Sequence, residues 1–412
     1  MNNYVLFNVI LQKNQYLCNL KTFSTLYILN RCEQFSYDMA GLYIHIPFCE
    51  SRCIYCGFYS TTLAQLKEQY VEAVCKEASN TLHLKNAFRS FSTVYLGGGT
   101  PSQLSPALLH RLFEHLEIGD KANSKELEIT MECNPDDLTD DYAAALRDLP
   151  INRISMGAQT FSDDRLRFLH RRHTSRQVSE AVERLRHIGI DNISIDLMFG
   201  FPGETLSDWE ADIQQSLTLQ VEHISAYSLM FEEGTPLYAL REQGKVKEVD
   251  EELSLKMYET LIDRLTAAGY EHYEISNFAR PGFHSRHNSS YWDGTPYIGL
   301  GAAAHSYDID SRWWNISNVR EYIRRVQHDE SPIEETEVLN DETRYNDAVM
   351  TALRTREGLP LERLSESQRQ YLLSQARPHL ERQLITMEDN HLRLTRQGLF
   401  VSDMVMSDLM MV

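Results

Sequence analysis

The sequence predicts an α/β protein with an incomplete parallel barrel of six β/α units, followed by a small, mainly helical module. From Met39 onward, short apolar runs alternate with longer stretches of helical spacing, which is the pattern of βαβ units. Polar residues also fall at the ends of the predicted strands, where parallel barrels gather their functional groups. The strands are expected at 42–46, 92–96, 127–131, 153–156, 193–198 and 224–229.

Helical spacing predicts the connecting helices at 64–84, 106–116, 140–149, 175–188, 206–219 and 251–268. The barrel is therefore expected over 39–270. The segment 271–335 is interpreted as an aromatic loop region, followed by a helix at 319–327 and an acidic linker. The C-terminal module is expected over 336–412, with helices at 343–353 and 361–374. Two short apolar stretches after Leu384 could form the strands of a wing, which makes the module winged-helix-like.

Residues 1–38 have no sustained period, and polar residues interrupt every apolar run. They fit neither a signal peptide nor a membrane span. Because Met39 directly precedes the first predicted strand, this extension is interpreted as dispensable or as a mis-assigned start.

Composition limits the possible partners and the compartment. The 412 residues carry a net charge of −19, which argues against a nucleic-acid surface and against docking on anionic lipid. No stretch is long and apolar enough to predict a transmembrane segment. The seven cysteines do not resemble a disulfide framework. Thiolate ligands need a reducing compartment, so the sequence predicts a cytoplasmic protein.

The densest motif is Cys49, Cys53 and Cys56, in a C-x3-C-x2-C spacing with Tyr55 before the last cysteine. Three thiolates can hold three irons of a [4Fe-4S] cluster and leave the fourth iron open for chemistry. A zinc knuckle or three unrelated core cysteines are the alternatives, although zinc sites usually need a second pair, and none follows here. The spacing resembles the radical S-adenosylmethionine (SAM) superfamily, in which the open iron binds SAM.

Other polar positions have a structural and a functional interpretation. The glycines before Thr100 could form a tight turn or allow a ligand to approach the backbone. Acids and amides at strand ends could cap helices or bind the charged groups of SAM. His287 lies in an aromatic segment, HNSSYW, and could be a structural histidine or an axial ligand to the iron of a flat macrocycle.

Six segments together resemble the oxygen-independent coproporphyrinogen III oxidase family of radical SAM proteins. They are YIHIPFC at 43–49, GGGTPS at 97–102, SMGAQTF at 155–161, DLMFGFPGET at 196–205, EISNFAR at 274–280 and HNSSYW at 287–292. The family has an oxidase branch and a haem-chaperone branch. The oxidase has a further cysteine where this sequence has Phe58, and the chaperone carries an HNxxYW motif, so this sequence resembles the chaperone. Gly57 departs from the aspartate that is common in that branch.

The resemblance implies a [4Fe-4S] cluster on Cys49, Cys53 and Cys56 and haem on His287, and it assigns no catalytic residue. It implies SAM contacts from Tyr43, Tyr55, Gly98, Gly99, Thr100, Glu132, Gln159, Arg171 and Asp196. It also implies a haem-acceptor protein, such as a respiratory haem protein, and a low-potential electron donor such as flavodoxin or ferredoxin. The alternative function is oxidative decarboxylation of coproporphyrinogen III to protoporphyrinogen IX.

Overall fold

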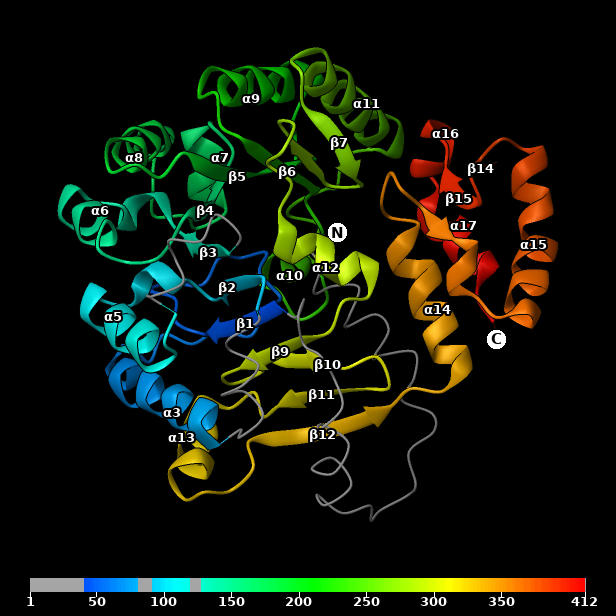
Figure 1. Ribbon diagram of the computed structural model, residues 1–412. Coiled ribbons are helices and arrows are strands. Elements are labelled where there is room, and N and C mark those ends of the chain that lie inside the picture. Colours follow the sequence, from blue (N-terminus) through cyan, green and yellow to red (C-terminus); the bar gives the residue numbers. More distant parts are fainter. Residues whose placement is uncertain (1–40, 81–90, 119–126, 412) are drawn as a thin grey trace.

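The computed structural model describes residues 41–80, 91–118 and 127–411. These residues form a twelve-stranded sheet flanked by helices, and a second, three-stranded sheet near the C-terminus (Figure 1). The extension 1–38 and the end of the first predicted helix, 81–84, lie outside the described residues. Within the described ranges, none of the helices has both the length and the apolar character needed to cross a bilayer.

Six consecutive parallel strands form the centre of the large sheet, as the sequence predicted. Along β3, Ile129 and Met131 are fully buried, while Glu132 lies on the opposite face, as the two-residue period of a strand requires. One face of the strands thus packs on helices and the other carries polar groups. The strands are β1 (Gly41–Ile46), β2 (Thr93–Gly98), β3 (Glu128–Cys133), β4 (Arg153–Gln159), β5 (Asn192–Phe199) and β6 (His223–Ser228).

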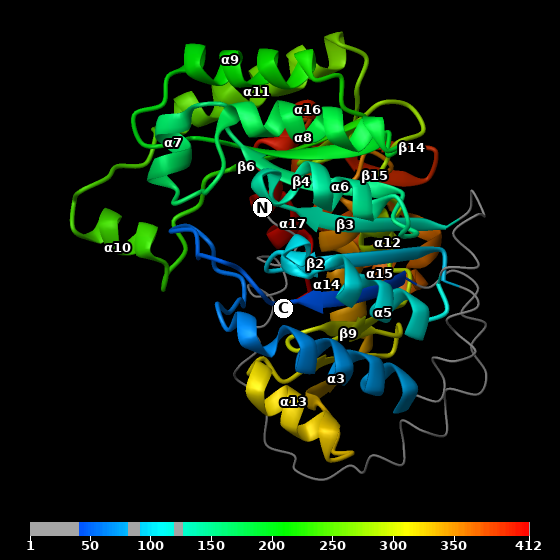
Figure 2. The ribbon, with the colours of Figure 1, turned by 90° about the vertical axis from the view of Figure 1, so that its left-hand side faces the viewer.

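Helices cover the outer face of these strands (Figures 1 and 2). They are α3 (Lys67–Asn80), α5 (Pro106–His115), α6 (Asp140–Leu146), α8 (Ser175–His187), α9 (Leu206–Thr218) and α11 (Glu251–Ala267). In α8 a capping box formed by Thr174 and Gln177 starts the helix, and its buried residues recur at helical spacing from Val178 to Leu185. Two helices of only 6 and 7 residues, α7 (Asp163–Phe168) and α10 (Pro236–Glu242), were not predicted because they are too short to show a period.

Within 271–335 the helix expected at 319–327 is present, but the loops and the linker expected around it are wrong, because the sheet continues through this segment. Each strand here has only 3 to 6 residues, too few for a clear alternation. The last strand lies at the edge of the sheet and is rich in glutamate, which suits an exposed edge. The same glutamates made this strand hard to recognise in the sequence. The strands are β7 (Glu271–Glu274), β8 (Asn277–Ala279), β9 (Tyr297–Leu300), β10 (His305–Tyr307), β11 (Ser311–Asn315) and β12 (Ile333–Val338).

The HNSSYW segment was also expected to be a loop, and it is instead the helix α12 (Arg286–Asp293). Ser285 caps its first turn by accepting a hydrogen bond from the backbone N–H of Asn288. Gly294 ends it in the left-handed conformation, at φ 74°. The serine and the glycine were visible in the sequence as helix boundaries, but the polar residues between them hid the period.

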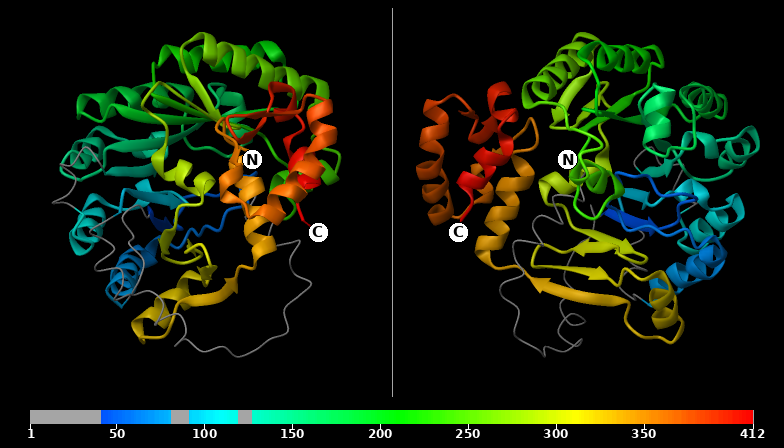
Figure 3. Two further views of the ribbon diagram at one scale, coloured as in Figure 1. Left: turned by 45° about the vertical axis from the view of Figure 1, so that its right-hand side comes forward. Right: turned by 180° about the vertical axis from the view of Figure 1, so that it is seen from behind.

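The C-terminal module has its own apolar core, which includes Tyr345, Leu372 and Leu409. The predicted wing strands are present, and they are joined at Asp389 and Asn390, both of which have positive φ, as a tight hairpin requires. The helix α13 (Val319–Gln327) precedes this module and packs on α3. The module itself contains α14 (Asp341–Ala352), β13 (Leu359–Pro360), α15 (Glu366–Glu381), β14 (Ile385–Glu388), β15 (His391–Leu394), α16 (Arg396–Leu399) and α17 (Ser402–Leu409) (Figure 3).

The module packs directly against α12. The backbone N–H of Ile275 donates to the carbonyl of Arg354, and the N–H of Arg356 donates to the carbonyl of Tyr273, each at 3.0 Å. The guanidinium of Arg354 lies 5.1 Å from the ring centre of Trp292 on α12. The helix that carries His287 is therefore held between the barrel and the module.

Candidate functional site

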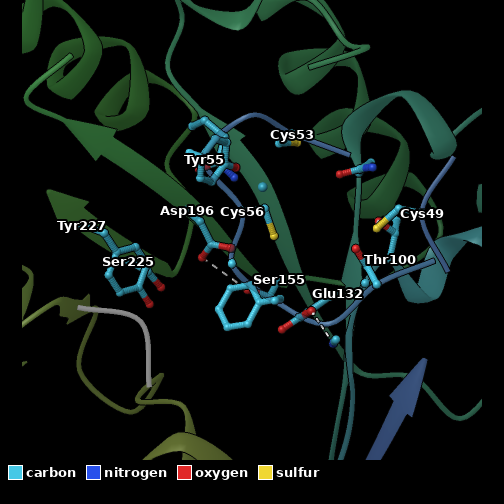
Figure 4. Close-up of a pocket in the computed structure, with 18 of the residues that line it drawn as sticks. Cys49, Cys53, Tyr55, Cys56, Thr100, Glu132, Ser155, Asp196, Ser225 and Tyr227 are labelled. Carbon is cyan, nitrogen blue, oxygen red and sulfur yellow. Dashed lines mark hydrogen bonds between the residues drawn. The ribbon is translucent and has the colours of Figure 1, made fainter. Parts of the chain in front are cut away.

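One cavity of about 260 Å³ is lined from the ends of the parallel strands, the loop after β1 and the helix α12. Its walls include every residue that the sequence predicted for the cluster, SAM or haem, and several of these are labelled in Figure 4. These are Tyr43, Cys49, Cys53, Tyr55, Cys56, Gly98, Gly99, Thr100, Glu132, Gln159, Arg171, Asp196 and His287. The structure thus brings together residues that are up to 244 positions apart in the sequence, from Tyr43 to His287.

The cysteine loop is anchored at its middle. Ile54 is 5% exposed, its N–H donates to the carbonyl of Leu169 at 3.3 Å, and its carbonyl accepts from the N–H of Leu237 at 2.9 Å. The sulfur of Cys49 lies 3.5 Å from the hydroxyl of Thr100 on the next loop. Fixing the loop between these contacts directs its thiols toward the cavity, and Figure 4 shows the three cysteines around its upper part.

The donor set fits a metal cluster. Three thiols face one cavity, and burial raises the pKa of Cys56 to about 12 and also raises that of Cys49, so without a cation these groups stay neutral. Bound iron reverses this preference, because its charge favours the thiolate. In the described ranges, no three histidine, cysteine or acidic side chains are arranged around one point to hold a single metal ion.

Arg171 is the cation beside the cysteine loop. Its Nη2 donates to Oδ1 of Asn134 at 2.7 Å and to the carbonyl of Gly157 at 2.8 Å, and its Nη1 lies 3.6 Å from the sulfur of Cys53. The guanidinium is therefore fixed next to a cysteine, with the remaining Nη1 and Nε donors available to a carboxylate.

Two acids line the same cavity as this cation. Glu132 accepts hydrogen bonds from the hydroxyl of Tyr95 at 2.9 Å and from the N–H of Gly98 at 3.1 Å. Burial raises the pKa of Glu132 to about 7 and that of Asp196 to about 6. Neither acid forms an ion pair with a lysine or arginine among the described residues. This wall of the cavity suits a ligand that brings positive charge and hydroxyl donors.

Packing of the chain requires glycine at positions 98 and 99, and both glycines also form part of the cavity wall. Gly98 has φ 115°, and a Cβ there would lie 2.6 Å from the ring of His45. A Cβ on Gly99 would lie 2.7 Å from the backbone of Pro47. The chain's own packing thus requires glycine here, and the backbone that results forms part of the wall.

Gln159 adopts a left-handed conformation, at φ 65°, where β4 loses its register with β5. A non-glycine residue in this conformation carries a strain cost, and such residues cluster at binding sites. Its side chain crowds Gly157, where a Cβ would lie 2.7 Å from Nε2. The structure therefore holds Gln159 in an unusual position on the cavity wall.

His287 is almost fully buried, and both of its ring nitrogens are hydrogen-bonded. Nδ1 lies 2.8 Å from the hydroxyl of Thr93, and Nε2 lies 2.9 Å from the hydroxyl of Tyr291. The ring stacks on Tyr95 at 5.0 Å and lies 6.4 Å from the ring of Tyr43. Burial lowers the pKa of His287 to about 3, so the imidazole is neutral, as an iron ligand must be. Binding iron through Nε2 would require Tyr291 to give up its hydrogen bond.

Several residues of the cavity wall were not predicted from the sequence. Tyr95 and Asn134 position Glu132 and Arg171, respectively, while other missed residues lie on β4 and β6. Alternation along the strands was the signal that could have found them, because residues two positions apart face the same side. The missed residues on β4 and β6 include Ser155, Ser225 and Tyr227.

Comparison with known proteins identifies the family. Residues 43–215 match the Radical SAM superfamily, and residues 339–401 match the HemN C-terminal domain. A Bacillus subtilis (strain 168) protein described as the heme chaperone HemW is 36% identical over 365 residues, which span 87% of this chain and 96% of the relative. The chain belongs to the HemW family of radical SAM proteins. A HemW of Lactococcus lactis is 37% identical over 328 residues, spanning 78% of this chain and 83% of its own length.

Among solved structures, the coproporphyrinogen III oxidase HemN from Escherichia coli has the same fold. Its TM-score is 0.80 with 22% sequence identity, and the match covers 97% of this chain and 98% of that one. This confirms the predicted fold class, a radical SAM barrel with a small C-terminal module. Membership of the superfamily implies a [4Fe-4S] cluster and SAM, in agreement with the thiols, acids and cation that line the cavity of this HemW-family chain.

Proposed function

We propose that the protein is a haem chaperone, which binds a [4Fe-4S] cluster, SAM and haem and passes the haem to an acceptor protein. The observation that carries this proposal is that the three cysteines and the imidazole of His287 line the same cavity. The absence of a fourth cysteine at Phe58 and the HemW description of the relatives support the chaperone over the oxidase.

In this proposal Cys49, Cys53 and Cys56 hold the cluster. When bound, the cluster supplies one electron at low potential. Arg171 binds the carboxylate of SAM, and Glu132 and Asp196 bind its ammonium and hydroxyl groups. The remaining contacts to SAM come from Tyr43, Tyr55, Gly98, Gly99, Thr100 and Gln159.

His287 binds the haem iron through Nε2 after the hydroxyl of Tyr291 has moved away. The C-terminal module packs on α12 through Arg354 and Trp292, and we assign it to covering the haem side of the barrel. The proposed division keeps 39–270 as the barrel and 336–412 as the module, with 271–335 completing the sheet between them. A low-potential donor such as flavodoxin or ferredoxin reduces the cluster, and the acceptor is a respiratory haem protein reached from the cytoplasm.

Two assays on anaerobically reconstituted protein test this function. In the first, haem is titrated in and the loaded protein is mixed with apomyoglobin as a generic acceptor; a stable Soret band that moves to apomyoglobin is expected. In the second, SAM, a reductant and coproporphyrinogen III are added. Release of CO₂ together with 5′-deoxyadenosine would overturn the chaperone and establish the oxidase instead.

A further inference from the structure

The cavity raises the question of whether SAM and haem can be bound together. The α12 residues His287, Asn288 and Tyr291 line the same cavity as the acids Glu132 and Asp196. The volume of about 260 Å³ lies below the range of about 300–1,000 Å³ that encloses one drug-sized ligand. A macrocycle and a nucleoside cofactor would therefore have to share the walls of one small cavity.

The two ligand positions also share a wall. The ring of Tyr95 stacks on His287 at 5.0 Å, and the hydroxyl of the same tyrosine donates to Glu132 at 2.9 Å. The imidazole is thus separated from the acid by one side chain. The residues proposed for haem and for SAM therefore belong to one continuous wall of the cavity.

Charge favours one ligand over the other on this wall. SAM brings an ammonium and a sulfonium, which compensate the two acids, Glu132 and Asp196, whose pKa values burial has raised. Haem brings two propionates, which the same acids repel. The acids therefore favour SAM, while Arg171 in the same cavity offers its remaining donors to a carboxylate of either ligand, so that the two ligands compete for one cation.

We infer that SAM and haem exclude each other from this single cavity, so that SAM binding drives haem off the protein. This inference rests on the proposed function. It gives SAM a role in a chaperone without any cleavage of the cofactor: SAM unloads haem for the acceptor. Thermodynamic linkage requires the effect to be reciprocal, so bound haem weakens the binding of SAM by the same factor.

The test uses the full chain with its cluster reconstituted and kept oxidised, so that SAM is not cleaved. The dissociation constant for haem is measured from the Soret band at increasing SAM, and bound SAM is measured on the same samples by equilibrium dialysis. We expect the apparent constant to rise in proportion to SAM without a plateau, by about tenfold when SAM is present at about ten times its own dissociation constant. A haem affinity that is unchanged, or that reaches a plateau while both ligands stay bound, overturns the inference and leaves the chaperone function standing.

A variant links the effect to the cavity. In Glu132→Gln, SAM affinity falls, and the SAM concentration needed to displace haem should rise by the same factor while haem alone binds at least as tightly as before. If the variant released haem at the same SAM concentration as the wild-type protein, SAM would act at another site. That result would overturn the shared cavity. Failure of the wild-type protein to bind any haem would instead overturn the proposed function, and this inference with it.

Discussion

The Nε2 atom of His287 lies 2.9 Å from the hydroxyl of Tyr291, one turn further along α12. The same imidazole is held at Nδ1 by Thr93 on β2, so the ring is fixed in orientation and occupied at both nitrogens. A ligand for iron can be kept ready in this way, since a neutral ring needs only to exchange one hydrogen bond for the metal.

Replacing Tyr291 with phenylalanine should tighten haem binding. The change keeps the ring but removes the hydroxyl that competes for Nε2, and one neutral hydrogen bond contributes about 1 kcal/mol, which corresponds to about fivefold in affinity. Titration of the Soret band measures the effect. His287→Ala should abolish the band, whereas His284→Ala, a control on the neighbouring loop that pairs with Glu271, should keep it. Equal haem binding in Tyr291→Phe and wild type would show that iron does not use this nitrogen.

The cluster assignment is tested at Cys53. Cys53→Ala removes one of the three sulfur donors, so we expect anaerobically reconstituted protein to lose its brown colour and most of its iron and sulfide. Cys75→Ala is the matched control, because this cysteine is buried in α3 and does not line the cavity. Full iron and sulfide content in Cys53→Ala, or loss in both variants, would contradict the assignment.

Much of the site could be predicted because parallel strands end at one edge of a sheet. Glu132 and Gln159 lie at or next to the ends of their strands and Asp196 lies within its strand, so the strand order alone brings them together. Arg171 follows a short helix that the sequence did not reveal. It was expected at the site because the carboxylate of SAM needs a cation, with a solvated arginine as the alternative, and the family resemblance agreed. Its place beside Cys53 depends on Asn134 and Gly157, which no local pattern connects to it.

The surroundings of His287 could not be predicted because they depend on distant contacts. Thr93 is 194 positions away in sequence, and the hydrogen bond forms only once β2 and α12 pack together. The residues of α12 themselves did not decide between a helix and a turn, because asparagine and two serines favour turns as readily as helices. The strands of 271–335 were missed for a different reason: stretches of only 3 to 6 residues contain too little of a period to detect.

The junction of the added strands with the barrel depends on one buried acid. Glu77 on α3 accepts hydrogen bonds from the N–H of Gly301 at 2.8 Å, Nδ2 of Asn315 at 2.6 Å and the hydroxyl of Tyr322 at 2.5 Å. Glu77→Ala leaves these donors buried without their acceptor, so we expect a loss of about 3–5 kcal/mol in the free energy of unfolding. Denaturant unfolding of the protein measures this.

Glu72→Ala provides the control for that measurement. Glu72 lies on the same helix but is exposed and pairs with Arg111 at 3.1 Å on the surface. Exposed pairs contribute little, so the change should stay within about 1 kcal/mol. Comparable losses in the two variants would mean that Glu77 does not join α3 to the added strands.

SAM binding should weaken as the pH falls. The pKa of Glu132 is raised to about 7 and that of Asp196 to about 6, so the free protein protonates first the glutamate and then the aspartate between pH 8 and pH 5. The cationic cofactor prefers the ionised acids, and its affinity should drop by about tenfold or more over this range. Equilibrium dialysis with labelled SAM at several pH values measures the profile. Glu132→Gln should remove the step near pH 7 and keep the one near pH 6, and Glu114→Gln, an exposed acid on α5, should keep both. An affinity that stays constant with pH in the wild-type protein would mean that neither acid faces the charge of the cofactor.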